Sequence, residues 1–386
     1  MMSSDLHLWN FMPAEVLAHV FSFLPARDRH SVSRVCKHWA AAVSASSVWS
    51  FTEINCESEK EEGEDEGDTA SFLLKMIQVH MGHIRYFKIV LDISLELNRR
   101  LACTILDVMA WSGCRLQAFH IVCYGKNPFF YSGQDVLQSF RRLLQSLDKI
   151  LLQHMDFRQM PFILDNHTVG LMGSCAPNLR TLLINNHSPG LLMLRQEIIV
   201  DVLKACPKLC ILGVSYVALS RDLFRELLKP TREPFKFLDL FYNGLDTDIP
   251  EELWTAMRER HPSFRVGLEF AATVPTRKMS QILKPCLPVA ALRFNGFTHM
   301  ADQVRLVASI YGRTLEKLVL HSAPSDNLNA SLIQLARACV HLREIHCFCL
   351  VDQGVVVAFR RHCKNLNRYT LSTSLFFCDN PPTIVQ

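Results

Sequence analysis

Histidines and cysteines near the carboxyl end of the chain are of the types that could bind a metal ion. His341, His346, Cys347 and Cys349 lie close together, and imidazole and thiolate groups are the usual ligands of tetrahedral zinc. In an extended strand, however, side chains alternate between the two faces, so Cys347 and Cys349 point to one side and His346 to the other. These side chains cannot converge on one ion. We therefore interpret the two cysteines as core residues and predict no metal site.

A second pair, Cys36 and His38, has the types of a thiol nucleophile and its base. Residues two apart on a helix diverge, so this pair does not form a catalytic dyad. The sequence also lacks the GxSxG, GxGxxG, P-loop and HExxH patterns of common enzyme classes. We therefore predict a non-catalytic protein that needs no cofactor.

The composition is that of an ordinary globular protein. Of the 386 residues, 49% are hydrophobic and 20% charged, and the length fits several domains or one repeat array. No apolar run has the length of a signal peptide or of a membrane helix. The 14 cysteines of a chain with no export signal are expected to stay reduced. We expect a cytoplasmic protein, with the nucleus as a second location and no membrane association.

One short stretch is strongly acidic. Glu57 to Asp68 holds eight acids and one lysine, a net charge of −7, so the other residues carry +11 within the chain total of +4. So many like charges cannot pack, and the stretch is predicted to be a disordered loop. The basic remainder raises the alternative of a nucleic-acid-binding protein. Its basic residues are scattered, which favours a solvated surface.

Two amphipathic helices are predicted in the first fifty residues. Pro13 suits the first turn of a helix, and the apolar face that follows is Val16, Leu17, Val20, Phe21 and Leu24. Pro25 ends this helix, and Asp28 is a good N-cap for the next. The second apolar face is Val32, Val35, Cys36, Trp39 and Val43. A segment this short cannot bury so much apolar surface alone, so the remainder either packs on the next domain or binds a partner.

These helices resemble the F-box. The stretch MPAEVLAHVFSFLPARDRHSVSRVCKHW, followed by SVW, matches that family at Pro13, Glu15-Val16-Leu17, Phe21, Leu24, Arg27-Asp28, Val35-Cys36-Lys37, Trp39 and Trp49. Met12 replaces the usual leucine and conserves its volume. Arg29 stands where a leucine often follows the aspartate, which puts its own contact in question.

The resemblance implies a partner and a site. An F-box binds the Skp adaptor and, through it, the cullin and RING subunits of a ubiquitin ligase. The adaptor-binding residues implied in this sequence are Pro13, Leu17, Val20, Phe21, Leu24, Val35 and Trp39.

Beyond the acidic stretch, an LxxLxL pattern recurs with drifting spacing. Its copies begin at Ile84, Leu116, Leu147, Leu179, Leu209, Phe235, Phe264, Val289, Leu315, Leu342 and Leu366. The copy at Phe264 is doubtful because its middle position fails. The steps straddle the roughly 20–29 residues of leucine-rich repeats, and helical stretches lie between the copies. A cysteine stands three residues before the first leucine of the copy in CPKL, CVHL and CKNL. This resembles the cysteine-containing repeats of the F-box/leucine-rich-repeat family.

The predicted fold is α/β: a short all-helical F-box followed by a curved solenoid with parallel strands on its concave side and helices on its convex side. The predicted divisions are a tail at 1–8, the F-box at 9–55, an acidic loop at 56–70, about ten or eleven repeats at 71–375 and a carboxy-terminal tail at 376–386.

The repeat register predicts which side chains a target protein would contact. The second and third apolar positions of each copy point into the core, so the residues around them point to the concave face. The predicted target-binding residues are Phe237, Asp239, Phe241, Arg293, Lys317, His321, Glu344, His346, Phe348 and Arg368. The alternative is that the carboxy-terminal tail folds back and covers this face.

The family resemblance implies the substrate-recognition subunit of a Skp–cullin–F-box ubiquitin ligase, which leads its target to ubiquitination and proteasomal degradation. The alternative is an interaction protein that binds the adaptor without directing degradation. Both need the same two surfaces, so the sequence leaves them open, and it does not identify the target.

Overall fold

The computed structural model describes residues 9, 11–56, 66–126, 131–187 and 194–373. The chain divides into two compact units, residues 1–209 and 210–386. Among these described residues, the first unit holds the amino-terminal helices and five strands, and the second holds seven strands. Most of the predicted acidic loop and both predicted tails lie outside the described residues. At the ends of that loop, Cys56 belongs to a strand and residues 66–70 belong to a helix.

Within residues 11–56, four short helices form the amino-terminal module. They are α2 (Ala14–Ser22), α3 (Ala26–Ser33), α4 (Lys37–Val43) and α5 (Ser46–Ser50). Pro13 and Pro25 precede α2 and α3 as N-cap residues, where the missing N–H of proline costs no helical hydrogen bond. The prediction that Asp28 caps the second helix is wrong, since Asp28 lies in its first turn. The predicted second helix is also interrupted at Cys36. Cys36 is the N-cap of α4, and its sulfur accepts a hydrogen bond from the amide of Trp39.

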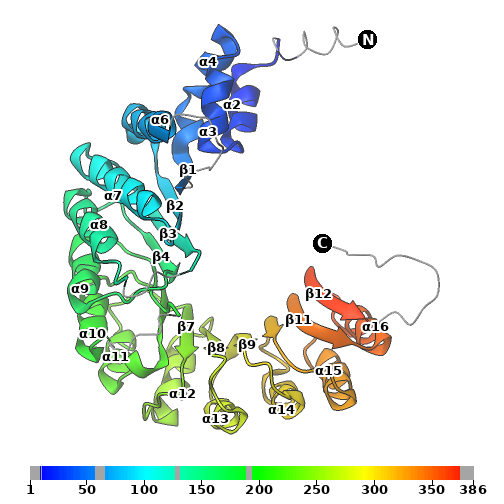
Figure 1. Ribbon diagram of the computed structural model, residues 1–386. Helices are drawn as coiled ribbons and strands as arrows, with labels where there is room; N and C mark the ends of the chain where they lie inside the picture. The colour runs from blue at the N-terminus through cyan, green and yellow to red at the C-terminus, as the bar shows by residue number, and fades with distance from the viewer. Residues whose placement is uncertain (1–8, 10, 57–65, 127–130, 188–193, 374–386) are drawn as a thin grey trace, which may run out of the picture. The chain divides into compact units, whose positions relative to one another are not determined.

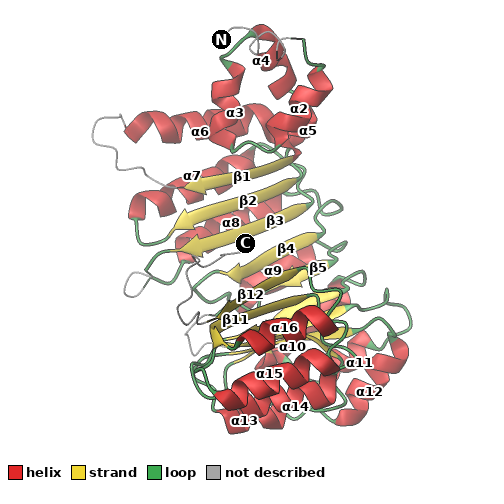
Figure 2. Cartoon of the chain, turned by 90° about the vertical axis from the view of Figure 1, so that its right-hand side faces the viewer, coloured by secondary structure: helices red, strands yellow, loops and turns green. Residues whose placement is uncertain are grey.

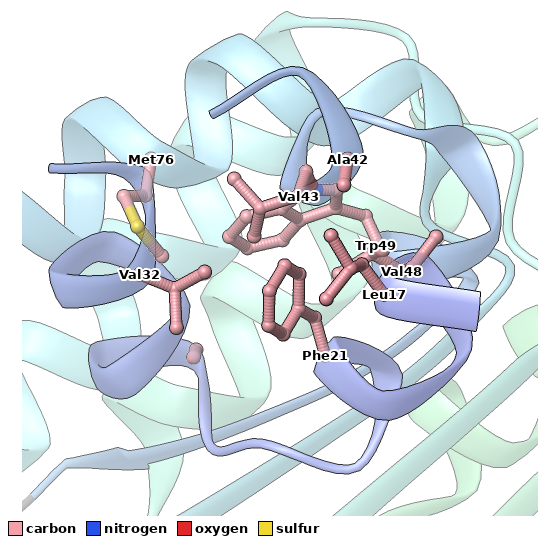
Figure 3. Close-up of a cluster of buried hydrophobic side chains, with 10 residues drawn as sticks. Leu17, Phe21, Val32, Ala42, Val43, Val48, Trp49 and Met76 are labelled. Atoms are coloured by element: carbon pink, nitrogen blue, oxygen red, sulfur yellow. The ribbon is translucent and has the colours of Figure 1, made fainter. Parts of the chain in front are cut away.

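The module has a closed apolar core (Figure 3). Leu17 and Phe21 of α2 lie at its centre, 0% and 2% exposed. Trp49 contributes from α5 and donates its indole N–H to the carbonyl of Val43 at 2.7 Å. Met76, from helix α6 (Glu66–His80), completes the cluster. The module therefore packs on α6, which begins within the last residues of the acidic stretch.

In the described part of the chain, twelve parallel strands follow one another in chain order. The first unit has β1 (Phe51–Cys56), β2 (Tyr86–Asp92), β3 (Ala118–Tyr124), β4 (His154–Gln159) and β5 (Thr181–Leu183). The second has β6 (Ile211–Ser215), β7 (Phe237–Tyr242), β8 (Arg265–Phe270), β9 (Val289–Phe294), β10 (Lys317–Leu320), β11 (Glu344–Val351) and β12 (Arg368–Thr373).

Helices connect the strands and cover one face of each unit's sheet (Figures 1 and 2). The first unit has α7 (Glu96–Trp111), α8 (Gln134–Ser146), α9 (Asn166–Cys175) and α10 (Gln196–Ala205). The second has α11 (Arg221–Leu227), α12 (Glu251–Arg260), α13 (Thr276–Ile282), α14 (Ala301–Tyr311), α15 (Asp326–Ala338) and α16 (Gln353–His362). Short 3₁₀ turns lie at Met81–His83 and Tyr216–Ala218. This confirms the predicted helical module followed by a strand–helix repeat.

The repeat register is confirmed in most copies. Leu238 and Leu240 of β7, like Leu318 and Leu320 of β10, are 0% exposed and face the helices. Residues between them face the opposite side, which we call the helix-free face.

Two copies of the repeat differ from the prediction. In the copy placed at Leu147, Ile150 is 66% exposed, and the buried residues are instead Leu152, Met155 and Phe157. The doubtful copy at Phe264 is one residue shorter than its neighbours. Phe264, Val266 and Leu268 are all buried, so the core positions recur every second residue from the start. The LxxLxL pattern does not fit this copy because one residue is missing after its first core position, although all of its core positions are apolar.

Strand β1 was not predicted. Its buried positions are Thr52, Ile54 and Cys56, and the hydroxyl of Thr52 donates to the carbonyl of Trp49 at 2.8 Å. A threonine in a leucine position hid this first copy. Its hydrogen bond satisfies the buried hydroxyl, so the substitution is tolerated.

The repeat cysteines end helices and join neighbouring repeats. Cys206 and Cys363 are the C-cap residues of α10 and α16. Each thiol donates to carbonyls of the preceding repeat, from Cys206 to Ala176 at 3.2 Å and from Cys363 to Cys339 at 3.5 Å. His261 holds the matching place after α12, contacting the carbonyl of Leu227 at 3.1 Å. A buried side-chain donor at this position links each of these three repeats to the one before it.

Within the described ranges, none of the helices is long and apolar enough to cross a membrane. The same part of the chain has no group of three or more histidine, cysteine or acidic side chains that could hold a metal ion.

Candidate protein-interaction surfaces

The outer side of α2 is an exposed apolar stripe. Val16, Val20 and Phe23 are 45%, 37% and 76% exposed, and their spacing of four and three residues puts them on one face of the helix. Val35, between α3 and α4, and Phe11, before α2, are exposed as well. We call Phe11, Val16, Val20, Phe23 and Val35 the F-box stripe. Apolar side chains gathered on one module are more informative than single exposed ones, because they mark interaction sites.

The predicted adaptor-binding residues divide between this surface and the core. Pro13, Val20 and Val35 are exposed, and Leu24 and Trp39 are half-buried. Leu17 and Phe21 are buried in the closed core, where they hold the helices together, and their contact with a partner stays a prediction. Phe11 and Phe23 were missed. The helical periodicity identified apolar positions but could not say which of them the neighbouring helices cover.

Arg29 joins the F-box helices to the first strand of the repeats. Its side chain is 3% exposed and donates to three carbonyls: Nε to Leu24 at 2.9 Å, Nη2 to Ser22 at 3.0 Å and Nη2 to Phe51 at 3.1 Å. Burial lowers the pKa of Arg29 to about 10. The guanidinium therefore remains charged near neutral pH and acts as a bridge between α2 and β1.

Trp49 lies between Arg29 and His80. The guanidinium carbon is 5.1 Å from the indole centroid, and the imidazole of His80 stacks on the ring at 4.0 Å with an interplanar angle of 3°. Burial is the main reason that the pKa of His80 falls to about 4, with smaller contributions from His83 and Arg29. A neutral His80 thus completes the connection between the F-box and α6.

A pocket of about 670 Å³ opens between the α2–α3 turn and the outer edge of β1. It is lined by Phe23, Pro25, Arg29, Phe51, Glu53 and Asn55, among others. The pocket therefore extends the F-box stripe from Phe23 toward the repeats.

The helix-free face of the second unit carries most of the predicted target-binding residues. Strand pairing aligns them in two rows across β7 to β12. One row is Asp239, Gly267, Ala291, Lys317, Glu344 and Arg368. The next row is Phe241, Glu269, Arg293, Val319, His346 and Thr370.

The β7 part of this face is more buried than predicted. Phe241 is only 8% exposed, and Phe237 and Asp239 are half-buried. Gly267 on β8 makes room for them: a Cβ there would lie 2.5 Å from Oδ1 of Asp239 and 2.9 Å from the ring of Phe237. The expectation of two exposed phenylalanines is thus wrong for Phe241, although both rings lie on the predicted side.

The middle of the face is an ionic network. Lys317 and Glu344 are 2.7 Å apart, and Glu344 also contacts His346 at 3.0 Å. Burial raises the pKa of Glu344, but the hydrogen bonds and charges of Lys317 and His346 outweigh it and hold that pKa below the ordinary value. Glu269 similarly receives the amide of Asn295 at 2.7 Å and lies 3.8 Å from Arg293. The acids of the network are thus neutralised internally.

Three rings form a stack beside this network. His321 stacks on Phe348 at 4.5 Å, and Phe297 meets His321 edge-on at 5.3 Å. Phe297 and Phe348 are 73% and 50% exposed. Because aromatic residues dominate the centres of protein interfaces, this ring stack is the part of the face best suited to a partner. Phe297 was missed because it follows β9 in a loop, outside the repeat register.

The first unit has its own charged helix-free face, which was also missed. Lys88 pairs with Glu53 at 3.1 Å, and Asp156 lies 2.7 Å from Arg158 and 3.7 Å from His120. Burial, partly opposed by Asp156, lowers the pKa of His120. The misplaced copy at Leu147 concealed this row, since it put the strand several residues before β4.

A closed F-box core followed by parallel strand–helix repeats defines the class of protein. Residues 9–52 match the F-box-like family, and the chain belongs to the F-box/leucine-rich-repeat proteins.

Among curated proteins, the chain is 35% identical to human F-box/LRR-repeat protein 8, over 93% of this chain and 94% of that protein. It is 34% identical to the Mus musculus protein of the same name, again over 93% and 94%. F-box/LRR-repeat protein 21 of Mus musculus is 22% identical over 92% of this chain and 80% of that protein. Among solved structures, the leucine-rich-repeat protein LegL7 of Legionella pneumophila aligns over 84% of this chain and 91% of its own, at 11% identity and a TM-score of 0.40.

Proposed function

We propose that this protein is the substrate-recognition subunit of a Skp–cullin–F-box ubiquitin ligase. The F-box binds the Skp adaptor, and a helix-free face binds the target protein. The chain itself is non-catalytic, and the RING subunit with its conjugating enzyme transfers ubiquitin.

The observation that carries this proposal is the exposed F-box stripe on a module whose core is already closed. Leu17 and Phe21 fill the core, whereas Val16, Val20 and Phe23 lie outside it and are 45%, 37% and 76% exposed. Burying a large apolar side chain in an interface stabilises a complex by roughly 1.5–3 kcal/mol. The stripe can therefore supply the affinity for the adaptor without any unfolding of the module.

For the target, the proposed contact residues are those of the second unit's helix-free face that remain accessible. They are Arg293, Lys317, His321, Glu344, His346, Phe348 and Arg368, together with Phe297. The charged residues would set orientation, and the rings of the stack would be the centre of the interface. Phe237 and Asp239 lie at its margin, and Phe241 supports it from below.

The experiment is co-purification of the Skp adaptor with a Val20→Asp, Phe23→Asp double variant. Charges on the stripe should abolish adaptor binding while the thermal unfolding of the chain stays unchanged. Val79→Asp is the matched control, since Val79 is 66% exposed on α6 and outside the stripe. Undiminished adaptor recovery with the double variant would contradict the proposal.

The non-degradative alternative has a separate test. If capture leads to degradation, the captured proteins should have shorter half-lives in cells that express the intact chain than in cells that express the double variant. Equal half-lives with intact adaptor binding would favour the interaction protein instead.

A further inference from the structure

Two thiols of β11 lie against each other. The sulfur atoms of Cys347 and Cys349 are 3.3 Å apart, and their spacing of two residues puts both on the side away from His346. Cys347 is 1% exposed, whereas Cys349 is half-buried. The sequence predicted the shared side but gave no sign of this contact.

The contact occurs at an irregularity of the strand. β11 pairs with β12 regularly from Glu344 to Cys347, and pairing resumes at Leu350 with Ser372 after a register shift. Phe348 and Cys349 therefore form a bulge. Such bulges bend a strand and redirect its side chains, so this segment can adjust where a regular strand could not.

The two thiols have unequal chemistry. The hydrogen bond from Cys347 lowers the pKa of Cys349, against the opposing effect of burial. The pKa of Cys347 is raised, chiefly by its hydrogen bond to Cys349 and then by burial. A partly exposed thiol with a lowered pKa and a second thiol in contact matches the arrangement of oxidation-sensitive cysteines.

We propose that Cys347 and Cys349 are a redox-sensitive thiol pair that hydrogen peroxide converts into a disulfide. The thiolate of Cys349 attacks one peroxide oxygen, which forms an S–O bond, breaks the O–O bond and releases hydroxide. Cys349 is thereby oxidised to a sulfenic acid, and the peroxide is reduced. The sulfur of Cys347 then attacks that of Cys349, the S–O bond breaks, and the departing hydroxide takes the proton of Cys347 as water.

The disulfide would enclose Phe348 between its two half-cystines. Phe348 stacks on His321 at 4.5 Å, so closing the bulge fixes or displaces one member of the ring stack. The thiol chemistry is independent of the ligase role, whereas an effect on target binding rests on the proposed function.

The test uses the full chain, prepared with its adaptor, reduced and then exposed to increasing hydrogen peroxide. Remaining thiols are blocked with iodoacetamide before digestion with trypsin. Cleavage after Arg343 and Arg360 gives a peptide that contains Cys347 and Cys349 and no other cysteine. Oxidation should yield this peptide lighter by two hydrogen atoms and unblocked, and a thiol reductant should restore the doubly blocked form.

The matched control is the buried pair Cys339 and Cys363, in which the thiol of Cys363 donates to the backbone carbonyls of Ala336 and Cys339 at 3.5 Å. This pair should stay reduced at peroxide doses that close the β11 pair. In a Cys347→Ser variant, Cys349 should stop at the sulfenic acid, which dimedone traps. Uniform oxidation of all cysteines, or a β11 peptide that remains doubly blocked, would overturn the proposal whatever the outcome for adaptor binding.

Discussion

The guanidinium of Arg29 donates to the carbonyl of Phe51 at 3.1 Å, across the junction between the F-box helices and the first repeat strand. The same side chain holds the carbonyls of Ser22 and Leu24 at the end of α2. Arg29 thus connects the helical module, which carries the exposed stripe, to the first strand of the sheet. Arg29 departs from the leucine that the F-box resemblance implies at this position, and its contacts are directed hydrogen bonds from a charged group.

Replacing Arg29 with lysine should destabilise the first unit. Lysine keeps the charge but cannot reach three carbonyls with one planar group. Hydrogen bonds to charged groups contribute about 1.5–3 kcal/mol each, so we expect a loss of roughly 2–4 kcal/mol in the free energy of unfolding. Chemical denaturation followed by tryptophan fluorescence measures it. Arg34→Lys, at an exposed position after α3, should change stability little; equal effects of the two would show that Arg29 is not a bridge.

Leu17→Ala and Val16→Ala should differ strongly although the residues are adjacent. Leu17 is 0% exposed and Val16 45%. Truncating a buried leucine costs roughly 2–5 kcal/mol, whereas exposed substitutions usually stay within about 0.5 kcal/mol. Thermal unfolding of both variants checks this. Adaptor binding should fall with Leu17→Ala only as far as the module unfolds.

Acid should weaken the junction through His80. Its pKa falls from 6.5 in the unfolded chain to about 4 in the fold. Between these values the unfolded chain binds a proton that the folded chain does not, so stability decreases as pH falls from about 6.5 toward 4. His80→Gln should remove part of this slope in unfolding measured at several pH values. His19→Gln, on the exposed side of α2, should leave it intact, and an unchanged slope in the His80 variant would contradict the prediction.

Phe241→Ser and Phe348→Ser should distinguish a residue that stabilises the helix-free face from one that is exposed on it for contact with a target. Phe241 is 8% exposed and Phe348 50%. Replacing a fully buried phenylalanine costs about 3–5 kcal/mol, so the first variant should lower the free energy of unfolding by roughly 3 kcal/mol. The second should stay within about 1 kcal/mol, since exposed sites tolerate substitution. Denaturation curves for the two variants decide it, and a larger loss at Phe348 would mean that the face is assigned in the wrong register.

The repeat and its inward-facing positions can be predicted from local sequence periodicity. In a strand, side chains alternate with a period of two, so Leu238 and Leu240 had to share a face whatever the neighbouring strands did. The same local rule put Cys347 and Cys349 on one side and His346 on the other. It failed where a copy departed from the pattern: at Thr52, at Phe264 and at Leu147.

Which apolar residues are covered depends instead on tertiary packing. Leu17 and Val20 are alike in the helical pattern, but α4 and α5 pack over one and leave the other outside. The bridge of Arg29 to Phe51 and the stack of Phe297, His321 and Phe348 join residues more than twenty positions apart. Such contacts depend on how helices pack and how successive strands align, and a local periodicity contains no information about either.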